Sequence, residues 1–213
     1  MPTSEAAPAP ITAKTIPSRE RILVAAKRLF ARNGYENTST IAVARDAGTS
    51  ESQLMKHFGS KQGLLEEILD RGWTAVMERV QALPADSSHS QRLVGMLMAI
   101  IIEMENDHEL KELMALEMRR VRKDSRDVLL SRGYRQFTEA LDSSLSEMRA
   151  QEQIRPELNP QALRAALIAI PEGLLRELVV ANRSDFRAEY SFDDMQRLLE
   201  SVVPALALKS AIG

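Results

Sequence analysis

Residues 38–64 read TSTIAVARDAGTSESQLMKHFGSKQGL, and this pattern predicts two short helices joined by a tight turn. Small residues precede Gly48, which marks the end of the first helix. After it, Ser50 and Gln53 have the spacing of a capping box, so the second helix should begin directly after Ser50. The predicted unit is a helix-turn-helix.

The second helix of this unit has two unlike faces. Leu54 and Phe58 share one face and can anchor the helix to a core, which turns Ser52 and Lys56 outward. A short, polar, cationic face of this kind could enter a DNA major groove, where polar side chains bond base edges and lysine meets phosphate. It could equally be an ordinary solvated helix face, with Gln53 only completing the capping box.

Three segments in this region carry a family resemblance: G-Y-x-x-T-S-T at 34–40, V-A-R-D-A-G-T-S at 43–50 and L-M-K-H-F-G-S-K-x-x-L-L at 54–65. They resemble the tetracycline-repressor (TetR) family of bacterial transcription regulators at several motif positions with the right spacing. The chain departs from the family at Met55, where tyrosine is usual, and at Ser52, where glycine is frequent. A contact between a phenolic hydroxyl and phosphate therefore cannot be carried over to Met55.

The resemblance implies a homodimeric, sequence-specific DNA-binding regulator, usually a repressor. Its two recognition helices would enter successive major grooves of a near-palindromic operator in double-stranded DNA. The candidates for base contacts are Glu51, Ser52, Gln53 and Met55, and the candidates for contacts with the DNA backbone are Thr38, Ser39, Lys56, His57 and Lys61. Lys61 follows a predicted N-cap at Ser60, where the helix dipole disfavours a cation by roughly 0.3–1 kcal/mol unless a phosphate lies there.

Composition indicates an all-α protein. The chain has 213 residues with nine Gly and nine Pro, it is rich in helix-forming residues, and no alternating β-strand pattern stands out. It has no cysteine, which excludes disulfides, thiolate nucleophiles and Cys-ligated zinc. The longest apolar run, residues 93–102, is too short to span a membrane, so we expect a soluble cytoplasmic protein.

Charge is distributed unevenly along the chain. Residues 1–62 hold nine Lys and Arg against five Asp and Glu, so acidic groups are in excess in the rest. Docking of the first part on phosphate would explain this asymmetry, and so would chance scatter of a modest number of charges. We expect a disordered tail over 1–16, a three-helix helix-turn-helix DNA-binding head over 17–62, and a helical ligand-binding and dimerisation domain over 63–213.

Periodic apolar residues predict the remaining helices. One helix starts near Ser18 and ends at Asn33, and a long one runs from Lys61 towards Leu83. Further helices are expected over 91–104, where the sequence is apolar on nearly every side, over about 107–122 and 124–150, and from Pro160 and Ser191 onward. The last two carry wide apolar stripes, which can either cover the body of the domain or form a four-helix bundle with a second copy. The family resemblance favours the homodimer.

Methionines are concentrated in the second part of the chain. Half of the ten methionines fall within residues 96–118. Because methionine adapts to irregular apolar ligands, a pocket for an apolar or amphipathic effector is one interpretation, and ordinary core filling is the other. The candidate pocket residues are Trp73, Met96, Met104, Met114, Met118, Tyr134 and Phe137.

No catalytic or metal-binding motif is visible in the sequence. His57, His89 and His108 are far apart, and neither a phosphate-binding loop nor a nucleophile–base spacing occurs. We therefore expect no enzyme, no cofactor and no metal. Two rival hypotheses stay open beside the regulator: a helical protein–protein interaction module without DNA binding, and a small-molecule carrier that is indifferent to DNA.

Overall fold

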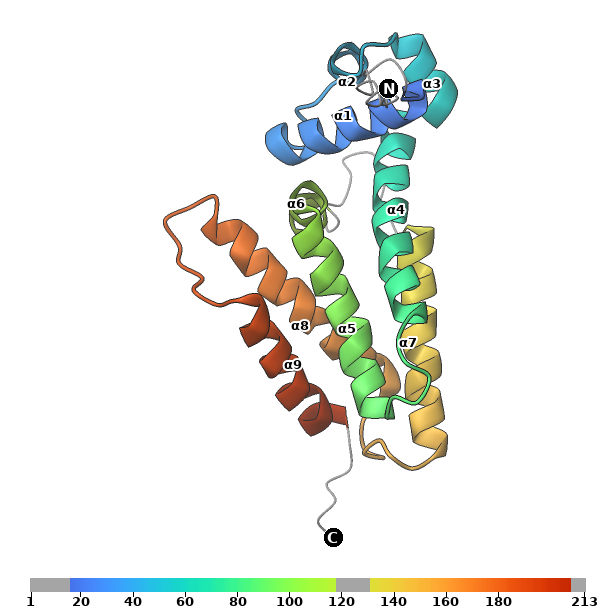
Figure 1. The fold of residues 1–213 in the computed structure, drawn as a ribbon, viewed down its shortest axis with the longest axis vertical. Coiled ribbons are helices and arrows are strands. Elements are labelled where there is room, and N and C mark those ends of the chain that lie inside the picture. The colour runs from blue at the N-terminus through green and yellow to red at the C-terminus, as the bar shows by residue number, and fades with distance from the viewer. Residues whose placement is uncertain (1–15, 118–130, 208–213) are drawn as a thin grey trace, which may run out of the picture. The chain divides into compact units, whose positions relative to one another are not determined.

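The computed structural model describes residues 16–117 and 131–207, and every regular element within them is an α-helix (Figure 1). The elements are α1 (Ser18–Asn33), α2 (Thr40–Asp46), α3 (Glu51–Phe58), α4 (Lys61–Gln81), α5 (His89–Asn106), α6 (His108–Glu117), α7 (Arg132–Ala150), α8 (Pro160–Ala181) and α9 (Phe192–Ala207). The prediction of an all-α fold is confirmed. Among these helices none combines the length and apolar character needed to cross a membrane.

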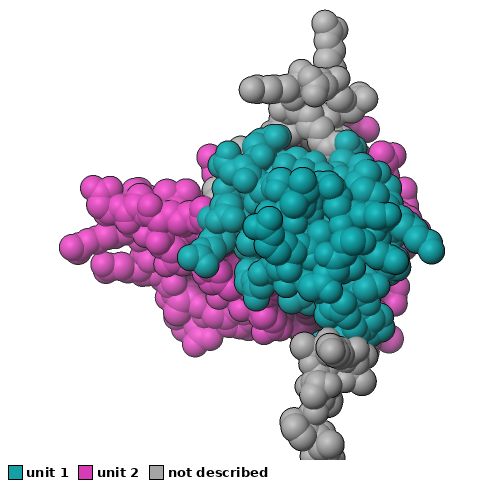
Figure 2. Space-filling model, turned by 90° about the horizontal axis from the view of Figure 1, so that it is seen from above, with its two compact units in different colours: residues 1–64 teal, residues 65–213 magenta. Residues whose placement is uncertain are grey.

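The chain divides into two compact units, residues 1–64 and 65–213, which Figure 2 colours separately. The sequence places this boundary between 62 and 63. The tail expected over 1–16 lies outside the described residues except for Ile16.

The first unit is a three-helix head. α1 packs against both α2 and α3, and α2 packs against α3. Its centre is formed by Ile22 and Phe30 of α1, Val43 of α2 and Leu54 of α3, all of which are buried. The ring of Tyr35, in the loop after α1, meets Phe30 edge-on with 5.2 Å between the ring centroids. These contacts hold α3 against the core by one face only.

In the second unit α5 is central, as its apolar composition predicts. It contacts α6, α7, α8 and α9, and its side chains Leu93, Leu97 and Ile101 are buried. α8 and α9 lie side by side along one flank (Figure 1). On the other flank α7 approaches α4 at Gly133, where an added Cβ would lie 2.4 Å from the Cβ of Trp73. Only glycine permits so close an approach.

One predicted helix boundary differs from the structure, and another lies outside the described residues. A continuous helix over about 124–150 is wrong, because Ser131 is the N-cap of α7 and its hydroxyl accepts a hydrogen bond from the backbone N–H of Tyr134 at 3.2 Å. The part of that expectation over 124–130 lies outside the described residues. So does the end of the helix expected over 107–122, since α6 is described only to Glu117.

Side-chain caps define the ends of α8 and α9. Asn159 accepts hydrogen bonds from two backbone N–H groups at the start of α8, which begins at Pro160 as predicted. α9 begins after Ser191, which exchanges hydrogen bonds with Asp194. At the far end of α9, the Arg155 guanidinium donates to the carbonyls of Ala205 and Leu206 at 2.7 and 2.6 Å. Arg155 precedes α8 in the chain, so it ties the end of α9 to the loop before α8.

Candidate nucleic-acid interface

The turn between α2 and α3 is held by the backbone and by one arginine. Gly48 has a φ of 63°, a conformation that glycine adopts without strain. The backbone N–H of Thr49 donates to the carbonyl of Ala44 at 2.9 Å. From α1, Arg21 donates to the carbonyls of Ala47 and Gly48 at 2.9 and 3.4 Å. No local signal in the sequence marks Arg21, because its partners lie 26 and 27 residues further along the chain.

α3 begins where the capping signal predicts. Ser50 is its N-cap, and the Ser50 hydroxyl accepts a hydrogen bond from the backbone N–H of Gln53 at 3.2 Å. Leu54 is fully buried, whereas Phe58 is only half-buried and carries the Arg19 guanidinium over its ring at 5.2 Å from the centroid. Leu54 is therefore the main anchor of this helix.

The face of α3 opposite Leu54 is open to solvent. Met55 is 42% exposed, which is a large value for an apolar side chain, and the rest of this face is polar. The exposed residues of α3 include all four candidates for base contacts and one backbone candidate, namely Glu51, Ser52, Gln53, Met55 and Lys56. The carboxylate of Glu51 accepts a hydrogen bond from the hydroxyl of Thr40, which links the starts of α2 and α3.

Thr38 lies in a different environment from the one expected. Its side chain is only 2% exposed, and its hydroxyl donates to the carbonyls of Leu29 and Gly34 at 3.2 and 2.9 Å. The hydroxyl thus satisfies acceptors at the carboxyl end of α1. A contact between the Thr38 side chain and the DNA backbone does not fit this geometry, so the expectation for Thr38 is corrected. Ser39 beside it is exposed and caps α2, with its hydroxyl accepting from the N–H of Ala42 at 3.1 Å.

His57 and Lys61 are both held by neighbouring parts of the head. His57 is half-buried, and its Nε2 lies 3.1 Å from the hydroxyl of Ser18 at the start of α1. Lys61 is the first residue of α4. Its ammonium donates to the carbonyl of Glu36 at 3.3 Å and lies 4.3 Å from the centroid of the Tyr35 ring. The ammonium therefore has a defined position beside the loop that leads into α2.

The candidate effector residues lie in the second unit. The structure brings three of them together, since the Trp73 ring lies 5.1 Å from the Tyr134 ring and 5.3 Å from the Phe137 ring, measured between centroids. Trp73 is buried, yet its indole N–H has no hydrogen-bond partner among the described residues. The methionine candidates are spread out: Met96 and Met104 are buried on α5, Met114 is half-buried on α6, and Met118 lies outside the described residues.

A further surface feature, not predicted as a site, is an open groove on α8 and α9. It has a volume of about 530 Å³. Its lining includes the apolar residues Ile170, Leu174, Val180, Phe186 and Leu198, together with Gly173, Arg176 and Glu177. The apolar stripes of the two helices were visible in the sequence. Phe186 lies in the loop between the helices and had no periodic signal to mark it.

The geometry of the head agrees with a comparison of sequences. The family model of the bacterial regulatory proteins of the tetR family matches residues 22–68, from α1 into α4. The chain belongs to the tetR family. This assignment confirms the predicted family and the predicted function, so the chain is a DNA-binding transcription regulator.

Relatives extend the likeness of this TetR-family regulator beyond its head. The HTH-type transcriptional regulator UidR of Escherichia coli K12 is 22% identical over 178 residues, which cover 83% of this chain and 87% of UidR. The HTH-type regulator YvkB of Bacillus subtilis is 40% identical over 55 residues, 26% of this chain and 29% of YvkB. The crystal structure of FadR from Bacillus subtilis, in complex with stearoyl-CoA, matches with a TM-score of 0.72 at 20% identity and covers 91% of this chain and 99% of FadR. The last comparison shows a shared fold.

Proposed function

We propose that this TetR-family regulator is a homodimeric repressor that reads an operator with two copies of α3 and leaves it when a small-molecule effector binds. The observation that carries the proposal is the α3 face: Leu54 anchors the helix, and the polar side chains opposite it are exposed. A helix held by one face and free on the other has the geometry needed to enter a major groove.

The α3 side chains divide by chemistry. The Gln53 amide can donate and accept at once, which suits a two-point contact with adenine. Met55 offers a methyl group to a thymine methyl and cannot replace the phenol that relatives usually have there. A glutamate such as Glu51 can accept a hydrogen bond from cytosine N4, and Thr40 already orients its carboxylate. Ser52 completes the set of candidates for base contacts.

A second group of side chains supports binding of the DNA backbone. Lys56 is exposed on α3, and Ser39 is exposed at the start of α2. His57 and Lys61 are held in place by the head itself. Contacts of this type position the protein on the duplex and contribute the salt-dependent part of affinity.

The groove on α8 and α9 supports a homodimer. A contact with two-fold symmetry must be complementary to itself. Arg176 and Glu177 are neighbours in the sequence, and both line the groove. In a symmetric contact the cation of one copy can therefore pair with the anion of the other. Gly173 has nothing within 4 Å of the place where a Cβ would lie, which leaves room for the close approach of a second helix. Dimerisation through the last two helices would cover the apolar side chains of this groove.

The surroundings of Trp73 support the effector. An unpartnered buried N–H costs roughly 1–3 kcal/mol, and a bound acceptor would recover part of this. The neighbouring rings of Tyr134 and Phe137 are apolar. We therefore expect a largely apolar molecule that carries a neutral acceptor such as a carbonyl. To act as an inducer it must bind the conformation that is not bound to DNA more tightly than the bound one.

The proposal is tested with duplex DNA from the region upstream of the regulator's own gene. Fluorescence anisotropy over a range of salt concentrations should show specific binding that weakens steeply with salt, with competitor DNA of unrelated sequence as the control. Absence of salt-dependent duplex binding would favour an interaction module instead. If the protein binds apolar carbonyl compounds but does not bind duplex DNA, a small-molecule carrier is favoured. Operation on genomic DNA also implies a cytoplasmic location, which cell fractionation checks.

A further inference from the structure

Helix α6 carries two buried charges of opposite sign side by side. Lys111 is 7% exposed and Glu112 is 8% exposed. Burial of a charge is costly unless the charge is paired and hydrogen-bonded. The partners of these two residues therefore determine where α6 can lie.

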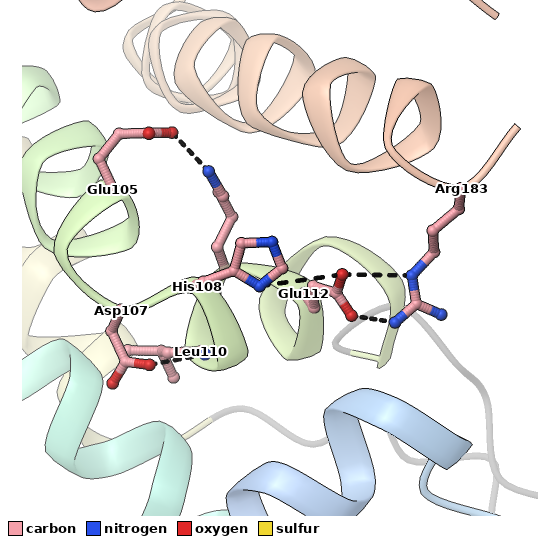
Figure 3. A network of polar contacts seen from close by, with 7 residues as sticks. Glu105, Asp107, His108, Leu110, Glu112 and Arg183 are labelled. Carbon is pink, nitrogen blue, oxygen red and sulfur yellow. Dashed lines mark hydrogen bonds and ion pairs between the residues drawn. The ribbon is translucent and has the colours of Figure 1, made fainter. Parts of the chain in front are cut away.

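The two charges tie α6 to the end of α5 and to the loop that follows α8 (Figure 3). The Lys111 ammonium donates to the carboxylate of Glu105, at the end of α5, at 2.7 Å. The Glu112 carboxylate is held at two points by Arg183, whose Nε donates to Oε1 at 3.3 Å and whose Nη2 donates to Oε2. His108 Nδ1 lies 4.0 Å from the same carboxylate. A two-point contact of this kind is sensitive to orientation as well as distance.

Arg183 lies at the start of the loop that forms part of the α8–α9 groove. It follows Asn182, the C-cap of α8, and its backbone N–H donates to the carbonyl of Val180 at 3.0 Å. The hydroxyl of Ser184 donates to the same carbonyl at 2.8 Å and accepts from the N–H of Phe186 at 3.2 Å. Val180 and Phe186 both line the groove. A continuous set of hydrogen bonds thus runs from α6 to the groove wall.

We propose that the Glu112–Arg183 pair sets the shape of the groove, so that the position of α6 controls how tightly two copies of the chain associate. The inference rests on the proposed homodimer through α8 and α9. Glu112 and Arg183 act as positioning residues, since neither is part of the groove lining. When α6 shifts, the two-point contact either breaks or moves the loop that carries Phe186. Because dimerisation brings two DNA-binding heads to one operator, this coupling gives α6 a route to DNA affinity.

The test compares dimer dissociation constants of full-length variants by analytical ultracentrifugation over a concentration series. R183K keeps a cation beside the buried carboxylate but loses the two-point geometry, and E112Q removes the charge with little change of shape. We expect each to weaken dimerisation by about tenfold, the effect of losing one charge-assisted hydrogen bond. The matched control is R187K on the same loop, because Arg187 and Glu189 form a pair whose side chains are 86% and 79% exposed. R187K should leave the constant within about twofold of wild type.

Thermal melting by circular dichroism separates this role from a merely structural one. A lower melting temperature with an unchanged dissociation constant would overturn the proposal, and so would an equal effect of R187K. Should E112Q fail to fold, R183K decides alone, because it leaves Glu112 paired with a cation. A wild-type chain that stays monomeric would overturn the proposed homodimer itself. The wild-type measurement shows this before any variant is compared. If wild type is dimeric and both variants keep its dissociation constant, only the proposed coupling between α6 and the groove is overturned.

Discussion

Replacement of Lys61 by methionine should weaken DNA binding without harming the fold. In the free protein the ammonium donates to the Glu36 carbonyl at 3.3 Å and lies 4.3 Å from the Tyr35 ring centroid. The loss of this cation–π contact costs about 0.5–1 kcal/mol. Removal of a cation from the first position of α4 regains roughly 0.3–1 kcal/mol, because the helix dipole opposes it there. The exposed hydrogen bond to Glu36 is also lost, so the net loss of stability should be about 1 kcal/mol, and the melting temperature should fall by only a few degrees.

The effect on DNA binding follows from counterion release. Each phosphate contact contributes about 0.9 to the slope of log affinity against log salt. A homodimer has two Lys61 residues, so K61M should reduce the slope by about 1.8. When the salt concentration rises fourfold, K61M should therefore lose roughly tenfold less affinity for DNA than wild type does.

The assay is anisotropy titration of an operator duplex and of an unrelated duplex at several salt concentrations. K61M should weaken both complexes alike and flatten the salt dependence. Q53A is the matched comparison, because Gln53 lies on the exposed face of α3 and carries no charge. It should keep the wild-type slope and lose preference at one base pair, by about 1–3 kcal/mol. Equal slopes and equal selectivity in the two variants would refute this division between backbone and base contacts.

Three further variants test the scaffold around the interface and the groove. R155M removes the donors that satisfy two carbonyls at the end of α9, and we expect urea unfolding to show a loss of about 2–3 kcal/mol. T38V removes the hydroxyl that donates to the carbonyls of Leu29 and Gly34, so stability should fall by about 1–3 kcal/mol while the salt slope of DNA binding stays unchanged. Hydrogen bonds from the Ser191 side chain and backbone, and then from Arg197, lower the pKa of Asp194 from its ordinary value. A lowered pKa in the folded state means that the carboxylate stabilises the protein above the ordinary value, and that this stabilisation is lost as the pH falls below it. D194N should therefore be less stable than wild type near neutral pH, and the difference in urea midpoint should shrink in acid; a difference independent of pH would contradict the assignment.

Much of the head could be predicted because its signals are local. The capping role of Ser50 involves a partner three residues away, and the positive φ of Gly48 reflects the conformational freedom of that residue alone. The burial of Leu54 follows from its place on the apolar face of a short helix. Such patterns recur with fixed spacing, so they can be read before the path of the chain is known.

Positions whose surroundings come from another helix could not be read in this way. Thr38 has the residue type of a helix cap or a phosphate contact, but its hydroxyl donates to the carbonyls of Leu29 in α1 and of Gly34 directly after that helix. Phe58 belongs to the apolar face of α3, yet it is only half-buried and lies under Arg19. In both cases the residue type was informative, and the neighbouring helix decided its environment.

By itself, the sequence determined that this protein is helical, that a helix-turn-helix lies in its first part, and which face of the second helix turns outward. These properties depend on side-chain spacing and on residue-specific backbone preferences, both of which act over a few residues. Only the tertiary structure decided that Glu112 meets Arg183, 71 residues away, and that Phe186 completes a groove with α8 and α9. Pairs so far apart meet only because of the path of the whole chain, and no periodic pattern encodes that path.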